Sequence, residues 1–406
     1  MKKILLLLAI SSFGIAFAQK KTTTTKPYFP SASQWEKKSA NDVGMDSILL
    51  EKAIQFAVEH ETKVPKDQEM AQIVNFYKEP FSDAVGPFAT RKSSSGVIIR
   101  KGYIISSWGD IDYSEQTNSV TKSFLSVVVG LAVDKGFIHS IDKVSDYVQL
   151  IEPFDPVTYR KPEDLGKSHF IIPFASEHNK KITWNHMLRQ TSDWEGTLWG
   201  KPDWADRPND KTQEWLTRKR NEPGSVYKYN DTRVNALALA ATAVWHKPLP
   251  EVLRTNIMEP IGASNNWHWT GYRNSWIILD GKQIQSVSGG GHFGGGLFIS
   301  AIDMARFGLL TLRNGNWDGK QLIDSNWIKL STTPTPANTG YGFMNFFLNT
   351  DKKFLPSAPA SAYAHIGNGT NMIYVDNEND LVIVARWIEN NKLDEMVKQF
   401  LDALKK

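Results

Sequence analysis

Strand-forming patterns lie near both ends of this 406-residue chain, and helical patterns fill the middle. The segment "GVIIRKGYIISSWGD" predicts two strands joined by a turn at Lys101-Gly102. Near the C-terminus, "YGFMNFFL", "NMIYVD" and "DLVIVARWI" predict further strands. This order indicates an α+β fold, in which an antiparallel sheet is built from both chain termini, flanked by helices, and carries an inserted, mostly helical lobe.

The boundaries of this arrangement follow from composition. Residues 1–18 hold two lysines, an apolar run and the small-residue pattern Ala16-Phe17-Ala18, which together predict a signal peptide. Residues 19–40 are polar and threonine-rich and predict a flexible leader. Residues 41–406 are predicted to form a single domain, with an α/β lobe at about 41–115 and 335–406 and a helical lobe at about 116–334.

A cleaved signal peptide predicts a periplasmic or secreted protein, and a retained N-terminal anchor is the alternative. No later segment is apolar for long enough to cross a bilayer. The chain has no cysteine, so we expect a packed core rather than disulfides to stabilise it. Loss of Lys2 and Lys3 with the signal lowers the formal net charge from +4 to +2, which gives no indication of nucleic-acid binding.

The segment from Val120 to Val133 is apolar on nearly every side, which predicts a helix buried within the protein. Lys122 lies in its first turn. A buried ammonium is costly unless it is paired or loses its proton, so this lysine requires an explanation.

Ser119 lies three residues before Lys122, on the same face of this helix. Backbone N–H groups and the helix dipole favour developing negative charge at a helix start, and a desolvated lysine can accept a serine proton. Ser119 is therefore a candidate nucleophile, although a capping serine beside a lysine that reaches solvent is the alternative. Ser225 and Lys228 have the same spacing but follow a Pro-Gly turn without an apolar helix, so context favours Ser119.

Two more segments support the nucleophile. "PGSVYKYND" contains Tyr229, Asn230 and Asp231, and "YAHIGNGTNMIYVD" places the segment from His365 to Gly367 immediately before a predicted strand. With Ser119 and Lys122, this order of residues resembles the serine β-lactamase and penicillin-binding-protein superfamily. The class C β-lactamases and the related esterases, DD-peptidases and 6-aminohexanoate-dimer hydrolases are the most similar branch. "ITWNHMLRQTSDW" and "GGGLFISAIDMARFGLLTLRNGNWDGKQLI" are also similar to segments of this superfamily.

The resemblance implies a role for each matched residue. Ser119 would form an acyl-enzyme, and Lys122 would accept its proton or hold the charge of the acceptor. Tyr229 would relay a proton to the leaving group and later activate water. Gly367 would let the strand edge approach the substrate, and the backbone N–H groups of Asn368 and Ser119 would form an oxyanion hole.

Three positions depart from the superfamily pattern. Asp231 stands where asparagine is usual, and its carboxylate could accept a hydrogen bond from Lys122 while also favouring the charged ammonium. Whether lysine or Tyr229 is the main base therefore stays open. His365 stands where β-lactamases usually carry lysine. Ile366 replaces a hydroxyl residue that helps bind the carboxylate of a β-lactam or a D-Ala-D-Ala peptide, which favours less acidic substrates.

Other motifs in the chain have simpler explanations. "GGGHFG", residues 289–294, matches a dinucleotide fingerprint, but the next predicted helix begins only at Ser300, which favours a flexible turn. His292 in this turn is either a cleft residue or a surface residue. The remaining histidines show no metal-ligand spacing, so no metal and no cofactor is predicted. The tryptophans between Trp184 and Trp215 predict either an aromatic wall beside the cleft or core packing.

The sequence thus predicts an exported serine hydrolase that cleaves an ester or amide bond through an acyl-enzyme on Ser119. Its substrate would be a small-molecule ester, amide, peptide or β-lactam. One alternative is a β-lactamase or DD-peptidase acting on β-lactams or cell-wall peptides. A second alternative is a non-catalytic homologue that binds a ligand, which the departures at Asp231 and His365 motivate.

Overall fold

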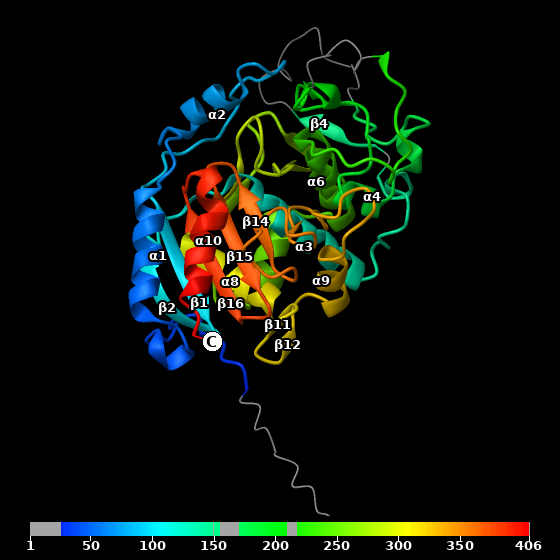
Figure 1. Cartoon of the computed structure of the whole chain (residues 1–406). Coiled ribbons are helices and arrows are strands. Elements are labelled where there is room, and N and C mark those ends of the chain that lie inside the picture. Colours follow the sequence, from blue (N-terminus) through cyan, green and yellow to red (C-terminus); the bar gives the residue numbers. More distant parts are fainter. Residues whose placement is uncertain (1–25, 149, 155–169, 209–216, 406) are drawn as a thin grey trace, which may run out of the picture.

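A computed structural model describes residues 26–148, 150–154, 170–208 and 217–405. Its centre is a six-stranded sheet with the strand order β13-β14-β15-β16-β1-β2 (Figure 1). Strand β1 (Ser95–Arg100) and β2 (Tyr103–Trp108) form the predicted hairpin, and β1 pairs antiparallel with β16 (Leu381–Arg386). The prediction of an antiparallel sheet built from both ends of the chain is therefore confirmed.

The C-terminal strands differ in part from the prediction. Strands β14 (Tyr363–Gly367) and β15 (Asn371–Asp376) form a hairpin, so residues 365–367 lie within a strand rather than before one. The predicted strand "YGFMNFFL" is mostly wrong, because only β13 (Phe347–Leu348) pairs with the sheet. A tight turn replaces the rest, since the Phe346 N–H donates to the carbonyl oxygen of Phe343 at 2.8 Å.

Alternate side chains of the sheet face two different cores, as the period of a strand requires. Ile98, Tyr374 and Ile383 belong to one core with helices α1 (Ser47–Glu59) and α10 (Leu393–Asp402). Figure 1 shows these two helices lying side by side against the sheet.

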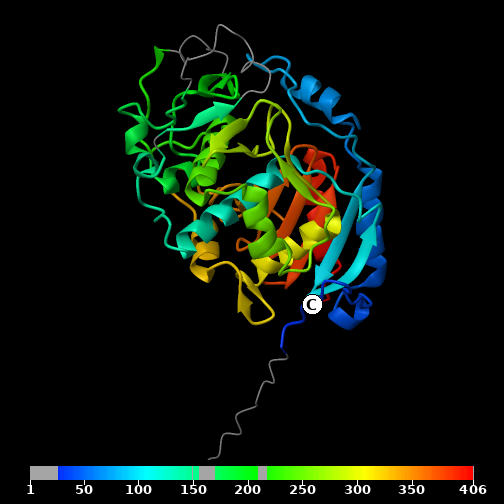
Figure 2. The ribbon, with the colours of Figure 1, turned by 180° about the vertical axis from the view of Figure 1, so that it is seen from behind.

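The opposite face of the sheet, seen from behind in Figure 2, packs on α8 (Ala301–Leu312). Val97, Val382 and Val384 lie in this second core. The boundary predicted for the helical lobe is therefore wrong at α8, which belongs with the sheet. Gly308 permits the close packing, because a Cβ atom there would lie 2.7 Å from side-chain atoms of Ile373 and Val382.

The helical lobe lies beside the sheet (Figure 1). Among its described helices are α3 (Thr121–Asp134), α4 (Trp184–Leu188), α6 (Asp231–Trp245), α7 (Leu249–Leu253) and α9 (Ser325–Ser331). Helix α3 is the apolar helix predicted to be buried, and its residues from Thr121 to Ala132 are all buried.

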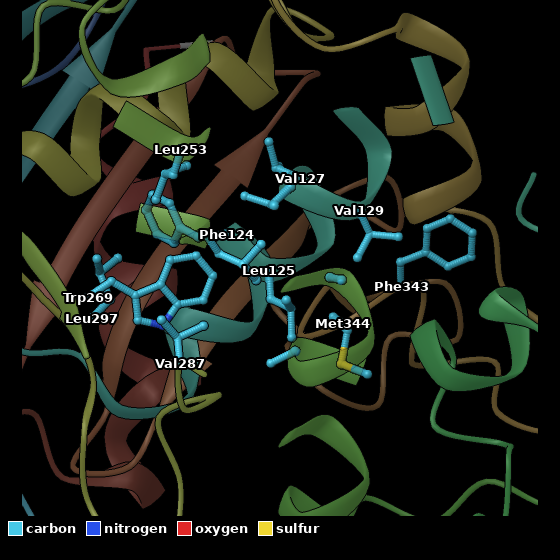
Figure 3. Close-up of a cluster of buried hydrophobic side chains, with 14 of the residues drawn as sticks. Phe124, Leu125, Val127, Val129, Leu253, Trp269, Val287, Leu297, Phe343 and Met344 are labelled. Carbon is cyan, nitrogen blue, oxygen red and sulfur yellow. The ribbon is translucent and has the colours of Figure 1, made fainter. Parts of the chain in front are cut away.

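Apolar residues from other segments lie on two sides of α3 (Figure 3). Leu253, Trp269 and Leu297 lie near Phe124 at one side, while Phe343 and Met344 lie toward Val129 and Leu125. Complete burial of each such apolar side chain stabilises the fold by roughly 1.5–3 kcal/mol. This packing fixes the first turn of α3, where Lys122 lies, within the interior.

Residues 26–40, which were predicted to be a flexible leader, pack against the body of the protein. Tyr28 stacks on Tyr103 with ring centroids 4.2 Å apart, and Trp35 Nε1 donates to the Gly102 carbonyl oxygen at 2.7 Å. The Ile104 N–H donates to the Glu36 carbonyl oxygen at 3.1 Å, so the segment covers the free edge of β2. The predicted signal peptide lies outside the described residues. Within the part of the chain described here, the helices are too short or too polar to span a membrane.

Candidate active site

Ser119 lies in a 3₁₀ turn, Asn118–Val120, that leads directly into α3. Asn118 has a φ of +52°, a conformation that asparagine adopts more readily than most residues. Its Nδ2 donates to the Asn368 carbonyl oxygen at 3.0 Å, and Thr121 Oγ1 donates to the Asn118 carbonyl oxygen at 2.6 Å. These bonds hold the turn between the start of α3 and the end of β14.

Lys122 Nζ has three oxygen neighbours. It lies 2.8 Å from Ser119 Oγ, 3.0 Å from the Gly289 carbonyl oxygen and 2.7 Å from Asp231 Oδ1. The lysine side chain is fully buried. A solvent-reaching lysine beside a capping serine, the alternative considered from the sequence, does not describe this arrangement.

Tyr229 is the third residue at this point. The Lys122 Nζ lies 5.2 Å from the centre of its ring, and burial raises the pKa of the Tyr229 phenol, which a hydrogen bond with Ser119 partly opposes. The structure thus brings Ser119, Lys122 and Tyr229 together from segments more than 100 residues apart.

Gly367 allows β14 to approach the turn that contains Ser119. A Cβ atom at this position would lie 2.0 Å from the Thr117 carbonyl oxygen and 3.1 Å from the Ser119 backbone nitrogen. Any larger residue would therefore push the strand away from Ser119. Asn368 follows at the rim of the site, where its carbonyl oxygen accepts the bond from Asn118.

Asp231 stands at the first position of α6, after the capping residue Asn230. Its carboxylate is buried and faces three cationic groups, with Oδ1 at Lys122 and Oδ2 2.9 Å from both Arg207 Nη1 and His292 Nδ1. Burial opposes ionisation, but Lys122 and Arg207 outweigh it and hold the pKa of Asp231 well below its ordinary value. The sequence predicts a substrate-binding role for Asp231. In the structure, Asp231 contacts the candidate base Lys122 and does not line the pocket.

His292 extends these contacts away from the lysine. Its Nε2 lies 2.5 Å from Glu79 Oε2 and 3.2 Å from Asp206 Oδ1. Burial opposes protonation, but Asp206 and the hydrogen bonds that the ring donates to Asp231 and Glu79 raise the pKa of this imidazole. His292 is thus neither the cleft residue nor the surface residue considered from the sequence, because its side chain is 1% exposed between carboxylates.

Two further contacts complete this group. Lys201 Nζ lies 3.1 Å from Glu79 Oε2, and Arg207 Nη1 lies 2.6 Å from Asp206 Oδ1. We call the connected set the charged cluster, and its members are Glu79, Lys122, Lys201, Asp206, Arg207, Asp231 and His292. Glu79, Asp206 and His292 also have the ligand atoms for a metal ion within 4.8 Å of one another. The adjacent Lys201 ammonium and the His292 ring already place positive charge beside these carboxylates, which disfavours a metal cation at this position.

His365 lies on β14 and does not line the pocket described next. Its ring is fully buried against Phe307, Phe346 and Tyr363, with centroids 4.5–5.6 Å away. This burial lowers the pKa of His365 to about 3, so the imidazole is neutral at ordinary pH. The predicted substrate-binding role of His365 is therefore not supported by its position. Ile366, its neighbour, faces the pocket instead.

A pocket of about 480 Å³ opens beside Ser119. Tyr229 and Arg207 line one part of it, and Asn75 and Phe76 of α2 (Gln68–Phe76) line another. Phe347, Asn390 and the segment from Ile366 to Thr370 complete the described wall. Among the predicted site residues, Ser119, Tyr229, Gly367 and Asn368 reach this pocket.

The remaining sequence motifs have structural roles. Trp184, Trp194 and Trp199 are core residues, so the predicted aromatic wall is not formed by them, and Trp215 lies outside the described residues. The turn at residues 289–294 supplies the Gly289 carbonyl oxygen to Lys122 and places His292 in the charged cluster. Ser225 is exposed and its hydroxyl donates to the Glu222 carbonyl oxygen at 2.6 Å.

Comparison with known proteins identifies the family. Residues 116–394, more than half of the chain, match the family model described as Beta-lactamase. The chain belongs to this family, whose members share the β-lactamase fold of hydrolases. The predicted resemblance to β-lactamases and penicillin-binding proteins is thereby confirmed.

Individual relatives are distant. The 6-aminohexanoate-dimer hydrolase of Paenarthrobacter ureafaciens is 24% identical over 274 residues, which cover 66% of this chain and 64% of that enzyme. The match thus spans less than two thirds of the relative's length. A β-lactamase from Mycobacterium bovis superposes with a TM-score of 0.52 at 15% identity, covering 77% of this chain and 95% of that chain. EstCE1, a hydrolase with promiscuous acyltransferase activity, superposes with a TM-score of 0.52 at 14% identity. The match covers 88% of this chain and 99% of that chain. These two similarities concern the fold.

Proposed function

We propose that this protein is a serine hydrolase that cleaves an ester or amide bond through an acyl-enzyme on Ser119. One observation carries the proposal: the buried Lys122 Nζ lies 2.8 Å from Ser119 Oγ and is also held by the Gly289 carbonyl oxygen and Asp231. A neutral amine at this position can donate an N–H group to the Gly289 carbonyl oxygen and use its lone pair to accept the proton of the serine hydroxyl.

In the acylation step, Ser119 Oγ attacks the substrate carbonyl carbon and its proton passes to Lys122. The carbonyl oxygen becomes an oxyanion, which the backbone N–H groups of Ser119 and Asn368 would stabilise. The tetrahedral intermediate then collapses, and Tyr229 passes a proton from Lys122 to the departing oxygen or nitrogen. The raised pKa of the phenol favours this donor role over that of a phenolate base, which is why we assign proton acceptance to Lys122.

Deacylation reverses the proton path. A water molecule attacks the acyl ester, Tyr229 and Lys122 receive its proton, and Ser119 Oγ regains a hydrogen as the acid product leaves. Asp231 has a positioning role, because it holds Lys122 in place and shares its negative charge with Arg207 and His292.

The test is covalent labelling of purified protein with a fluorophosphonate probe, followed by peptide mapping. We expect the label on Ser119, and we expect Ser119→Ala to lose both labelling and ester hydrolysis while unfolding at the same denaturant concentration. Ser225→Ala is the matched control, since Ser225 has the same spacing to a lysine but is exposed without a buried amine. Labelling that persists in Ser119→Ala would refute the proposal, and no labelling or turnover at all would favour a non-catalytic binding protein.

Turnover measurements distinguish the proposed esterase or amidase from the β-lactamase alternative. Ile366 offers no hydroxyl to a substrate carboxylate at its position in the pocket wall. We therefore expect purified protein to turn over 4-nitrophenyl esters faster than the β-lactam nitrocefin. Faster nitrocefin hydrolysis that depends on Ser119 would assign the β-lactamase activity instead.

We also propose that the protein is exported after cleavage of residues 1–18. The support is the charged, then apolar, then small-residue order at the N-terminus. Intact-mass measurement of protein expressed with its own N-terminus should give a chain that begins at Gln19. A full-length mass in the periplasmic or secreted fraction would contradict cleavage at this site.

A further inference from the structure

Arg207 is a cation that lines the pocket beside the proposed nucleophile. Its side chain is 34% exposed, whereas those of Lys122, Lys201 and His292 are at most 3% exposed. The described residues around the pocket include no aspartate or glutamate, and its polar wall otherwise consists of amides and hydroxyls. Arg207 therefore gives the pocket its charge.

The Arg207 guanidinium uses only part of its hydrogen-bonding capacity within the protein. Both of its ion pairs, to Asp206 Oδ1 and Asp231 Oδ2, are made by Nη1. Nε and Nη2 make no hydrogen bond to a described residue, although a guanidinium has five N–H donors. The group is held by these ion pairs and by the rings of Tyr229 and Phe76, whose centres lie 4.9 and 5.7 Å from Arg207 Cζ. It is thus fixed in place with donors to spare.

The charges around Arg207 favour an anion. The charged cluster contains four basic groups, namely Lys122, Lys201, Arg207 and His292, and three carboxylates. With Lys122 neutral, as the proposed acylation requires, the remaining three basic groups and the three carboxylates balance. Arg207 lines the pocket and no carboxylate of the cluster does, so an anionic ligand would meet positive charge there.

We propose that Arg207 binds a carboxylate of the substrate, so that this enzyme prefers esters or amides that carry a free carboxylate a short distance from the bond to be cleaved. The inference rests on the proposed function at Ser119. It assigns carboxylate binding to Arg207 rather than to Ile366, so the expectation drawn from Ile366 applies to substrates whose carboxylate would lie at Ile366, such as β-lactams, and not to those whose carboxylate reaches Arg207. Planar carboxylates fit a guanidinium with two parallel N–H donors, as Nε and Nη2 provide.

The test uses pairs of substrates that differ only in this charge. One pair is the mono-4-nitrophenyl ester of suberic acid and its methyl-capped counterpart, which place the charge on the acyl side. The other is the butyrate ester of 4-hydroxybenzoic acid and the same compound as its methyl ester, which place it on the leaving group. We expect the wild type to prefer the charged member of at least one pair by roughly tenfold to a hundredfold in kcat/KM, the range of a charge-assisted hydrogen bond.

Arg207→Gln should bring that ratio close to one. Arg207→Lys should leave a smaller preference, because lysine keeps the positive charge but lacks the two parallel N–H donors of the guanidinium. Because Arg207 also contacts Asp231, its variants can lose activity on every substrate, and the ratio is therefore the decisive quantity. Asn75→Asp is an independent test, since it adds a carboxylate to the pocket wall and leaves Arg207 unchanged. It should lower kcat/KM for the charged ester more than for the neutral one.

Two results would overturn the inference while the proposed function stands. One is Ser119-dependent hydrolysis of both members of each pair at equal rates by the wild type. The other is a preference for the charged ester that persists in Arg207→Gln and in Asn75→Asp. A failure of the proposed function looks different, because no substrate of either pair would then be cleaved and Ser119 would not be labelled.

Discussion

Two buried histidines, one in the charged cluster and one on β14, have opposite surroundings. His292 lies among Glu79, Asp206 and Asp231, which favour the imidazolium, whereas His365 lies among aromatic rings that favour the neutral ring. Burial alone would lower both pKa values. The difference shows that neighbouring carboxylates, rather than the extent of burial, decide which of the two histidines holds a charge.

The largest expected effect comes from removing the carboxylate that the charged cluster shares. Asp231→Asn leaves three buried or partly buried cations without their common partner, and we expect a loss of about 3–5 kcal/mol in the free energy of unfolding. Hydrolysis should fall at least about a hundredfold, because Lys122 is no longer held. Urea unfolding and initial rates measure the two effects.

Asp376→Asn is the control for this variant. Asp376 is also buried, but it accepts hydrogen bonds from the neutral groups of Tyr374 and Asn379. We expect its replacement to cost only about 1–2 kcal/mol and to leave the rate unchanged. Equal losses for the two variants would mean that the cations of the charged cluster do not depend on Asp231.

A second variant tests the close contact between β14 and the turn that contains Ser119. Gly367→Ala places a Cβ atom 2.0 Å from the Thr117 carbonyl oxygen, so β14 must move away from this turn. We expect a cost of about 1–3 kcal/mol and a loss of activity of at least about tenfold. Gly340→Ala, whose Cβ atom meets no atom closer than 3.4 Å, should change neither quantity. Wild-type rates in Gly367→Ala would show that this approach does not position the site.

The pH dependence of stability separates the two histidines, and His365 should give the larger slope. Its folded-state pKa is about 3, below the ordinary value of about 6.5, so the unfolded chain binds a proton that the folded protein does not. Stability should therefore fall on acidification, by about 2 kcal/mol between roughly pH 7.5 and 5. His365→Leu should lack this fall in urea unfolding measured across the same range. An unchanged slope in the variant would assign the acid sensitivity to other groups.

The smallest expected effect concerns His292, and its sign is reversed. Its pKa is raised in the folded state, so its contribution is fully present below the ordinary histidine pKa and is lost as the pH rises through the raised value. Lys122 and Arg207 still compensate Asp231 when the imidazole is neutral, which limits the loss. His292→Gln should remove this alkaline decline. A variant that parallels the wild type from pH 6 to 9 would mean that His292 does not titrate in that range.

Much of the fold could be predicted from local patterns. The hairpin of β1 and β2 and the buried helix α3 follow directly from hydrophobic periodicity. The strand prediction for "YGFMNFFL" was wrong because a run of aromatic residues indicates burial as readily as it indicates a strand. The flexible leader was wrong for residues 26–40 because the prediction rested on their polar composition. It gave no weight to Tyr28 and Trp35, which pack against the hairpin turn and β2.

The candidate site was predictable to a lesser degree. Ser119, Lys122 and Tyr229 stand in recognisable local motifs, and the structure brings them together. The charged cluster has no such motif, because Glu79 and His292 meet across 213 residues of sequence. The histidine in "GGGHFG" was a usable signal for part of this cluster, because a glycine-rich turn can pack closely against another segment. Here the turn brings Gly289 to Lys122 and His292 to Asp231. No comparable signal marked Arg207.

The pairing of β1 with β16 determines when the central sheet can form during synthesis of the chain. Translation produces β1 long before β16, so the central sheet cannot close until β16 has left the ribosome. Strand β14, with Gly367, is also made long after Ser119. Ser119 lacks its neighbouring strand until then, and a nascent chain that stalls before β14 holds this serine without a finished pocket.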